Sequence, residues 1–219
     1  MSIAKSCADF LRNSNRNLPS GKLRSGHAHE LVAAYFGYKT AAALRSEKHY
    51  PLSALGEADI LIPDLATMDT RRDKLKGLPL DLPSNDELAR ELSTFIKNMK
   101  YFDGEVWLDR DLRDPINGYI QDDPMVIEDE LSGEMATTNA YFDELYIDKY
   151  DYEVTADGFA ATLTGSLNGS PDPDKVYSGH KISFVSQMTM DRVAGRVAFT
   201  QPEFDTGGAV DDDYYEDEL

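Results

Sequence analysis

The chain of 219 residues contains 40 Asp and Glu against 22 Lys and Arg, giving a formal net charge of -18, and 41% of its residues are hydrophobic. This length suffices for one large or two small folded domains, and the charge disfavours nucleic acid and anionic membranes as partners and favours basic ones. The single cysteine, Cys7, excludes an internal disulfide framework and a thiolate zinc site.

Charge is distributed unevenly along the chain. Residues 1–50 carry eight Lys and Arg against three Asp and Glu, whereas residues 101–150 carry three against fourteen and residues 201–219 none against eight. The N-terminal segment lacks an apolar core of signal-peptide length, and no stretch approaches the ~18 apolar residues of a membrane span. We therefore expect a cytoplasmic protein with no membrane partner.

The first half has helical periodicity. Apolar residues between Ile3 and Leu11 fall on one helical face. Ser25 is expected to cap a second helix, Gly37 to end it in a left-handed turn, and Thr40 to cap a short third helix. A proline-containing stretch follows over residues 51–83, with one short helix expected over 66–76.

Ser84 and Glu87 match a capping box, and the apolar residues after them keep helical spacing as far as Met99. This pattern predicts a long amphipathic helix.

The second half changes to the period of strands. Apolar and polar residues alternate over 150–155, Asp157-Gly158 is expected to form a two-residue turn, and alternation resumes over 159–167. A further alternating run over 182–190 leads through an expected turn at Asp191-Arg192 into a strand over 193–199.

These patterns predict an α+β fold, with an N-terminal helical region followed by an antiparallel β-sheet in a meander. The expected domains are a helical one over 1–100 and a β domain over 101–204. The acidic segment 205–219 has no periodicity and is expected to be a disordered tail.

Residues 25–44 have the outline of a helix-turn-helix, which supports DNA binding as an alternative function. Its second helix would begin with Ala41, Ala42 and Ala43, whose side chains cannot hydrogen-bond to base edges. Packing or docking is therefore the favoured role of this hairpin. If nucleic acid is bound, the residues expected to contact it are Lys22, Arg24, Lys39 and Arg45.

The run GHAHELVAAYFGYKTAAAL resembles a short helical module near the N-termini of poorly characterised bacterial proteins, some of them labelled glyoxalase-related. The resemblance covers about 20 residues. It implies a helical structure and a bacterial or mobile-element origin, and it supplies no catalytic residue.

Two groups of residues raise metal chemistry as a further alternative. His27 and His29 stand two residues apart, and side chains at that spacing on a helix point in different directions. Asp172 and Asp174 could belong to a metal-dependent hydrolase or nuclease, but a third carboxylate would have to come from elsewhere and a plain turn explains both. We expect no metal, no cofactor and no catalytic residues.

The acidic stretch 103–157 is interleaved with tyrosines. Carboxylates on one face of a strand recur about every 6.6 Å, near two phosphate steps of a DNA strand, so such a surface can imitate nucleic acid toward a basic protein. The competing interpretation is a solvated acidic face. The sequence favours a non-enzymatic bacterial interaction protein (inhibitor, antitoxin or defence accessory), with expected partner-binding residues Asp148, Tyr150, Asp151, Tyr152, Glu153, Asp211, Asp212 and Asp213.

Overall fold

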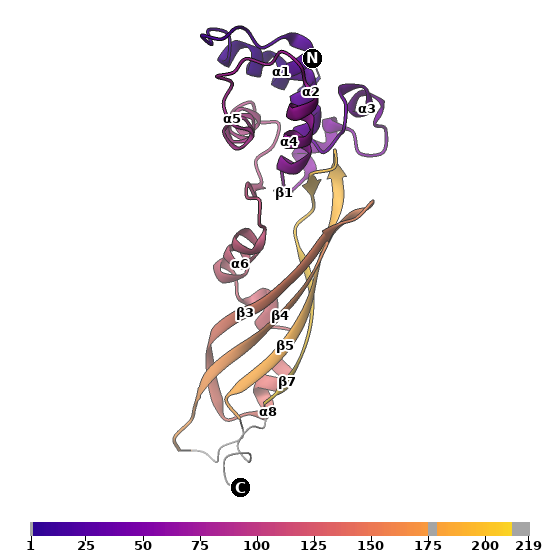
Figure 1. Cartoon of the computed structure of the whole chain (residues 1–219). Coiled ribbons are helices and arrows are strands. Elements are labelled where there is room, and N and C mark those ends of the chain that lie inside the picture. Colours follow the sequence, from indigo (N-terminus) through magenta and orange to yellow (C-terminus); the bar gives the residue numbers. More distant parts are fainter. Residues whose placement is uncertain (1, 175–178, 212–219) are drawn as a thin grey trace. The chain divides into compact units, whose positions relative to one another are not determined.

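The computed structural model describes residues 2–174 and 179–211, and the chain divides into two compact units (Figure 1). Unit 1 comprises Met1–Arg110 and Asp191–Gln201, and unit 2 comprises Asp111–Met190 and Pro202–Leu219. Unit 1 is therefore discontinuous in sequence, because residues 191–201 return to it after most of unit 2.

Unit 1 is mainly helical and contains a small mixed sheet. Strand β1 pairs in parallel with β2 and antiparallel with β6, and the last residues of β5 pair antiparallel with β6. Its elements are α1 (Ile3–Ser14), α2 (Ser25–Tyr35), α3 (Ala41–Ser46), a 3-10 helix η1 (Leu52–Glu57), β1 (Ile60–Leu61), α4 (Leu65–Lys74), α5 (Asn85–Asn98), β2 (Glu105–Val106) and β6 (Ala198–Phe199).

The caps of unit 1 helices follow the sequence signals with one exception. The Thr40 hydroxyl accepts a hydrogen bond from the Ala43 amide at 3.1 Å, and Ser84 and Glu87 form the predicted capping box. Gly37 has φ +82°, which ends α2 as expected. The exception is Ser25, which is the first residue of α2, because Arg24 occupies the cap position without a side-chain bond.

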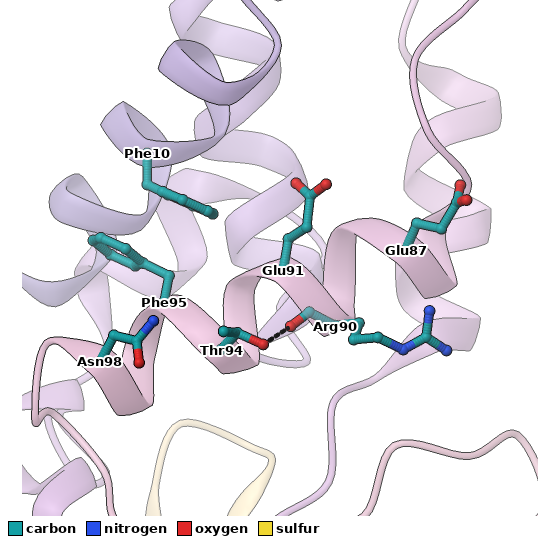
Figure 2. Close-up of a pocket in the computed structure, with 7 residues that line it drawn as sticks. All are labelled: Phe10, Glu87, Arg90, Glu91, Thr94, Phe95 and Asn98. Carbon is teal, nitrogen blue, oxygen red and sulfur yellow. Dashed lines mark hydrogen bonds between the residues drawn. The ribbon is translucent and has the colours of Figure 1, made fainter.

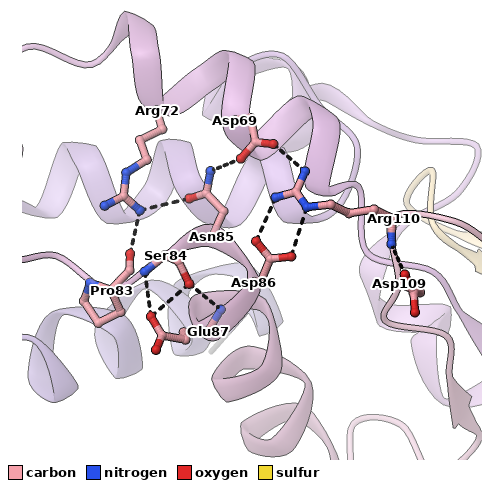
Figure 3. Close-up of polar contacts among 9 residues, drawn as sticks. All are labelled: Asp69, Arg72, Pro83, Ser84, Asn85, Asp86, Glu87, Asp109 and Arg110. Atoms are coloured by element: carbon pink, nitrogen blue, oxygen red, sulfur yellow. Dashed lines mark hydrogen bonds and ion pairs between the residues drawn. The ribbon is translucent and has the colours of Figure 1, made fainter.

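A network of polar side chains ties α4 to the start of α5 (Figure 3). Asn85 is buried and donates to Asp69 at 2.7 Å, while Arg72 donates to the carbonyls of Leu82 and Pro83. Arg110 forms ion pairs of 2.7 Å with both Asp69 and Asp86. The network therefore fixes the N-terminus of α5 from two sides.

The described residues of unit 2 form three helices and a twisted sheet. The strands lie in the order β7-β5-β4-β3, and the β5–β7 and β3–β4 pairs are antiparallel. Helix α6 packs on β3, and α7 and α8 pack on β7. The elements are α6 (Arg113–Asp122), α7 (Met125–Glu128), α8 (Ser132–Thr137), β3 (Ala140–Val154), β4 (Gly158–Pro171), β5 (Lys181–Ala194) and β7 (Glu203–Val210).

The predicted α+β class is confirmed. The predicted purely antiparallel meander is wrong, because β1 and β2 pair in parallel. Helices α6 to α8, which lie within the region 101–204, were not predicted from the sequence. The start of the expected tail is corrected, because residues 205 to 210 belong to strand β7 and pair with β5. Residues 212–219 of that tail lie outside the described residues.

Both predicted turns are displaced along the sequence. The Thr155 amide donates to the Gly158 carbonyl, so Ala156 and Asp157 form the turn between β3 and β4, one residue earlier than expected. Strand β5 continues through the expected turn at Asp191-Arg192 and ends at Ala194, followed by a turn that contains Gly195 at φ +59°.

Two β-bulges explain why β3 shows poor alternation in the sequence. The pairing of β3 with β4 shifts between Phe142 and Glu144 and again between Ile147 and Lys149, so Asp143 and Asp148 are extra residues. After each bulge the alternation of side chains between the two faces of the sheet shifts by one residue. Leu145, Ile147, Tyr150 and Tyr152 consequently share the inner face of the sheet, which α6 to α8 cover, despite their irregular spacing.

Candidate functional site

The outer face of the unit 2 sheet, opposite the helices, is the candidate site. The β3–β4 and β5–β7 registers and the alternating burial of β4 and β5 define which side chains belong to it. These side chains are Tyr141, Glu144, Tyr146, Lys149, Asp151 and Glu153 from β3, Ala160, Thr162, Thr164, Ser166 and Asn168 from β4, Lys181, Ser183, Val185, Gln187 and Thr189 from β5, and Glu203 and Asp205 from β7.

Acidic side chains stand at both edges of this outer face, and at the level of Asp151 and Asp205 the side chains between them are neutral. Asp151 lies opposite Thr162, whose hydroxyl donates to Gln187 at 3.0 Å, and Gln187 lies opposite Asp205. Three strand spacings of about 4.8 Å place the two acidic edges about 14 Å apart. Glu153 and Glu203 extend the same two edges by one further pair of residues.

The carboxylates of unit 2 are not neutralised by its own basic residues. Unit 2 carries 24 Asp and Glu against four Lys and Arg, whereas unit 1 carries 16 against 18. Among the residues that the structure describes, Asp151, Glu153, Glu203 and Asp205 form no ion pair. The whole excess negative charge of the chain therefore belongs to unit 2.

Exposed apolar side chains accompany the carboxylates on the outer face. Tyr141 is 68% exposed, Tyr146 50% and Val185 47%. Large apolar groups left open to water on a charged face are typical of surfaces that bind another protein.

The expected partner-binding residues do not all lie together. Asp151 and Glu153 are exposed on the outer face, and Asp148 is an exposed bulge residue. Tyr150 and Tyr152 lie on the inner face instead. The Tyr150 hydroxyl donates to Asn117 at 3.2 Å, burial raises its pKa, and the Tyr152 hydroxyl accepts from the Leu112 amide.

The acidic residues near the C-terminus add less unpaired negative charge to the outer face than expected from the sequence. Asp211 accepts from Ser183 at 2.8 Å and lies 3.4 Å from the Lys181 ammonium, so its charge is partly compensated. Asp212 and Asp213 lie outside the described residues. The sequence analysis missed Glu203 and Asp205, because only the pairing of β7 with β5 brings them to the outer face.

Carboxylates are also numerous on the helical side of unit 2. Eight of them lie between Asp111 and Glu134, on α6 to α8 and the segments beside them. Negative charge therefore surrounds unit 2 instead of gathering on one face. What distinguishes the outer face is the combination of its acidic edges with exposed apolar side chains.

The hairpin of α2 and α3 has its polar contacts directed into unit 1. Glu30 forms an ion pair of 2.6 Å with Arg71 and accepts from the Ala41 amide at 3.0 Å. Ala41 is buried, and α3 spans six residues. Lys22, Arg24, Lys39 and Arg45, the residues expected to contact nucleic acid, are all exposed around this hairpin.

The structure does not arrange the histidines and aspartates of the metal alternatives as a metal site within the described residues. Glu30, next to His29, is engaged by Arg71, and Asp172 accepts the Asp174 amide at 3.0 Å in a turn. Within residues 2–174 and 179–211, no group of three His, Cys, Asp or Glu side chains is placed to hold a metal ion.

A shallow groove of about 460 Å³ lies along α5 beside α1 (Figure 2). Phe10 and Phe95 stack with ring centroids 4.3 Å apart, and Glu87 is occupied by the capping box. The hydroxyl of Thr94 donates to the Arg90 carbonyl at 2.9 Å. The residues that line the groove are Phe10, Glu87, Arg90, Glu91, Thr94, Phe95 and Asn98.

Comparison with known proteins gives no relative, because no family model, curated protein or solved structure matches the chain. The likeness of residues 25–44 to a bacterial helical module therefore remains a resemblance. In the described part of the chain, no helix has the length and apolar composition to cross a membrane.

Proposed function

We propose that this chain is a non-enzymatic interaction protein that binds a basic protein partner through the outer face of unit 2. The observation that carries the proposal is the coincidence, on one sheet face, of unneutralised carboxylates at both edges with exposed Tyr141, Tyr146 and Val185. Solubility alone would explain the charge, whereas a protein interface would also give a role to the three exposed apolar groups on the same face.

The two features have different roles in binding. Acidic edges attract a cationic surface at long range and set its orientation, so they act mainly on the association rate. Tyr146 and Val185 supply apolar area that is buried on contact, so they act mainly on the lifetime of the complex. A partner is therefore expected to have a basic rim around a small apolar centre.

Nucleic-acid mimicry is the finer form of this proposal. Asp151 and Glu153 are two residues apart along β3, about 6.7 Å, which is close to two phosphate steps. The separation of about 14 Å between the acidic edges is near the width of about 12 Å of the DNA major groove. Such a partner would be a nucleic-acid-binding protein, which fits an inhibitor, an antitoxin or a defence accessory of a bacterial system.

The test compares two variants of the full chain that lose the same charge. One carries Asp151→Asn, Glu153→Gln, Glu203→Gln and Asp205→Asn on the outer face. The control carries Asp122→Asn, Asp123→Asn, Glu128→Gln and Glu134→Gln on the helical side. The wild type and both variants are immobilised on a resin and incubated with a bacterial lysate at low salt. The retained proteins are identified by mass spectrometry.

The proposal predicts that the wild type and the control retain the same basic protein, that the outer-face variant loses it, and that salt releases it. Equal retention by both variants would show that the outer face is not the binding surface. Retention that salt does not weaken would contradict an electrostatic contact.

A further inference from the structure

A second charged surface lies on unit 1, where two distant segments of the sequence meet. The turn after β5 docks on the segment between α2 and η1, because the Gly195 amide donates to the Tyr50 carbonyl at 2.8 Å and the Arg196 amide to the Phe36 carbonyl at 3.1 Å. A Cβ on Gly37 would lie 2.7 Å from the Arg196 Cβ, so glycine permits this close approach.

Both arginines of this turn region lie over tyrosine rings. The Arg196 guanidinium is 5.2 Å from the centre of the Tyr38 ring, and the Arg192 guanidinium is 5.5 Å from that of Tyr50. Cation–π stacking of this kind restricts the orientation of a guanidinium. The two arginines are thus positioned before any ligand arrives.

Only two carboxylates belong to these segments, and one is directed inward. Glu47 accepts from the Tyr38 hydroxyl at 2.8 Å and from the backbone amides of residues 48 to 50, so its charge is taken up by the fold. The other is the exposed Asp191. Against them stand five cations, which we call the basic patch: Lys39, Arg45, Lys48, Arg192 and Arg196.

Four of the five cations of the basic patch are open to solvent, and Arg192 is half-buried. Lys39, Arg45, Lys48 and Arg196 are exposed, and none of these four forms an ion pair with any residue in the described ranges. No large apolar side chain is exposed within it, and Tyr38 is only 3% exposed. The patch therefore offers charge and hydrogen-bond donors without an apolar centre.

We infer that the basic patch binds the sugar–phosphate backbone of a nucleic-acid duplex. A protein partner would need apolar area, which the outer face of unit 2 has and this patch lacks. A single strand would need open aromatic faces for its bases, but Arg192 and Arg196 already cover the rings of Tyr50 and Tyr38. Phosphates need only cations and donors.

Binding of this kind is independent of sequence. Phosphate contacts fix the position of a duplex without reading its bases, and the alanines at the start of α3 have no hydrogen-bonding group to read them. The inference differs from a helix-turn-helix mode, because two of its five cations come from residues 192–196 and not from the hairpin. It is also independent of the function proposed for unit 2.

The experiment measures the anisotropy of a fluorescent duplex DNA titrated with the full chain across about 50 to 200 mM salt. Five phosphate contacts predict that log K falls against log salt with a slope of about -4.5. Arg192→Gln with Arg196→Gln should weaken binding at least about tenfold and reduce the slope by about 2. Lys39→Gln with Lys48→Gln should do the same without touching either stacked pair.

The matched control is Arg16→Gln with Arg90→Gln, two exposed arginines outside the basic patch. The inference is supported if the control binds like the wild type and both patch variants do not. It is overturned if the control is weakened equally, if a single strand binds more tightly than the duplex, or if polyglutamate of equal charge displaces the duplex, since the last result would assign the patch to an acidic protein.

Discussion

Glu47 accepts four hydrogen bonds within unit 1, and they lower the pKa of its carboxyl to about 2, the bond from the Tyr38 hydroxyl having the largest effect. Because the folded-state pKa lies below the unfolded value, this contribution to stability is complete above about pH 5 and is lost as the pH falls toward 2. Acid therefore weakens the loop that carries the basic patch.

Replacement of Glu47 by Gln should lower the free energy of unfolding at pH 7 by about 1 to 2 kcal/mol, allowing for solvent screening of a partly exposed side chain. The variant should also lose part of the stability difference between pH 7 and pH 3. Urea unfolding at both pH values measures this. Glu57→Gln, at an exposed position in η1, is the control and should change neither value.

Cys7 is fully buried in α1, and burial raises the pKa of its thiol to about 12. Since the thiolate is the reactive form, Ellman's reagent should not label the native chain at pH 8 and should label one thiol per chain in denaturant. Rapid labelling of the native chain would show that the packing of α1 against its neighbours opens readily.

At the scale of elements, Gly165 permits the close approach of β3 to β4. A Cβ at this position would overlap the Tyr146 carbonyl oxygen and crowd the Phe184 ring, whereas a Cβ on Gly207 of β7 would meet nothing within 4 Å. Gly165→Ala should therefore lower the free energy of unfolding by about 2 kcal/mol or more, and Gly207→Ala should leave it nearly unchanged. Thermal unfolding followed by circular dichroism compares the two.

Elements whose signals are local could be predicted from the sequence. The capping box before α5, the glycine end of α2 and the alternation of β5 all depend on residues within one turn or strand. The bulges at Asp143 and Asp148 could not, because a bulge is defined by the partner strand. The acidic edge formed by Glu203 and Asp205 was missed for the same reason.

At the scale of the whole molecule, the two units have opposite electrostatic character. Unit 2 carries the excess of 20 negative charges, and unit 1 has a small positive excess of two. Like charges within unit 2 repel one another in the folded state, and salt screens that repulsion. The charge asymmetry was visible in the sequence, but the assignment of residues 191–201 to unit 1 was not.

Salt should consequently raise the protection of backbone amides against hydrogen exchange more in unit 2 than in unit 1. Hydrogen exchange followed by mass spectrometry, at low salt and at several times that concentration, should show slower exchange in peptides from β3 and β4 at the higher salt and little change in peptides from α5. Faster exchange in β3 and β4 at high salt would mean that attractive ion pairs dominate unit 2.

The discontinuity of unit 1 has a consequence for synthesis. Strand β6, which pairs with β1, and both stacked arginines are translated only after residues 111–190 have been synthesised. The edge of β1 that pairs with β6 therefore stays unpaired while residues 111–190 are synthesised. A stop codon placed after Arg110 would yield a chain that lacks β6 and both stacked arginines, so that of the small sheet only the β1–β2 pair could form.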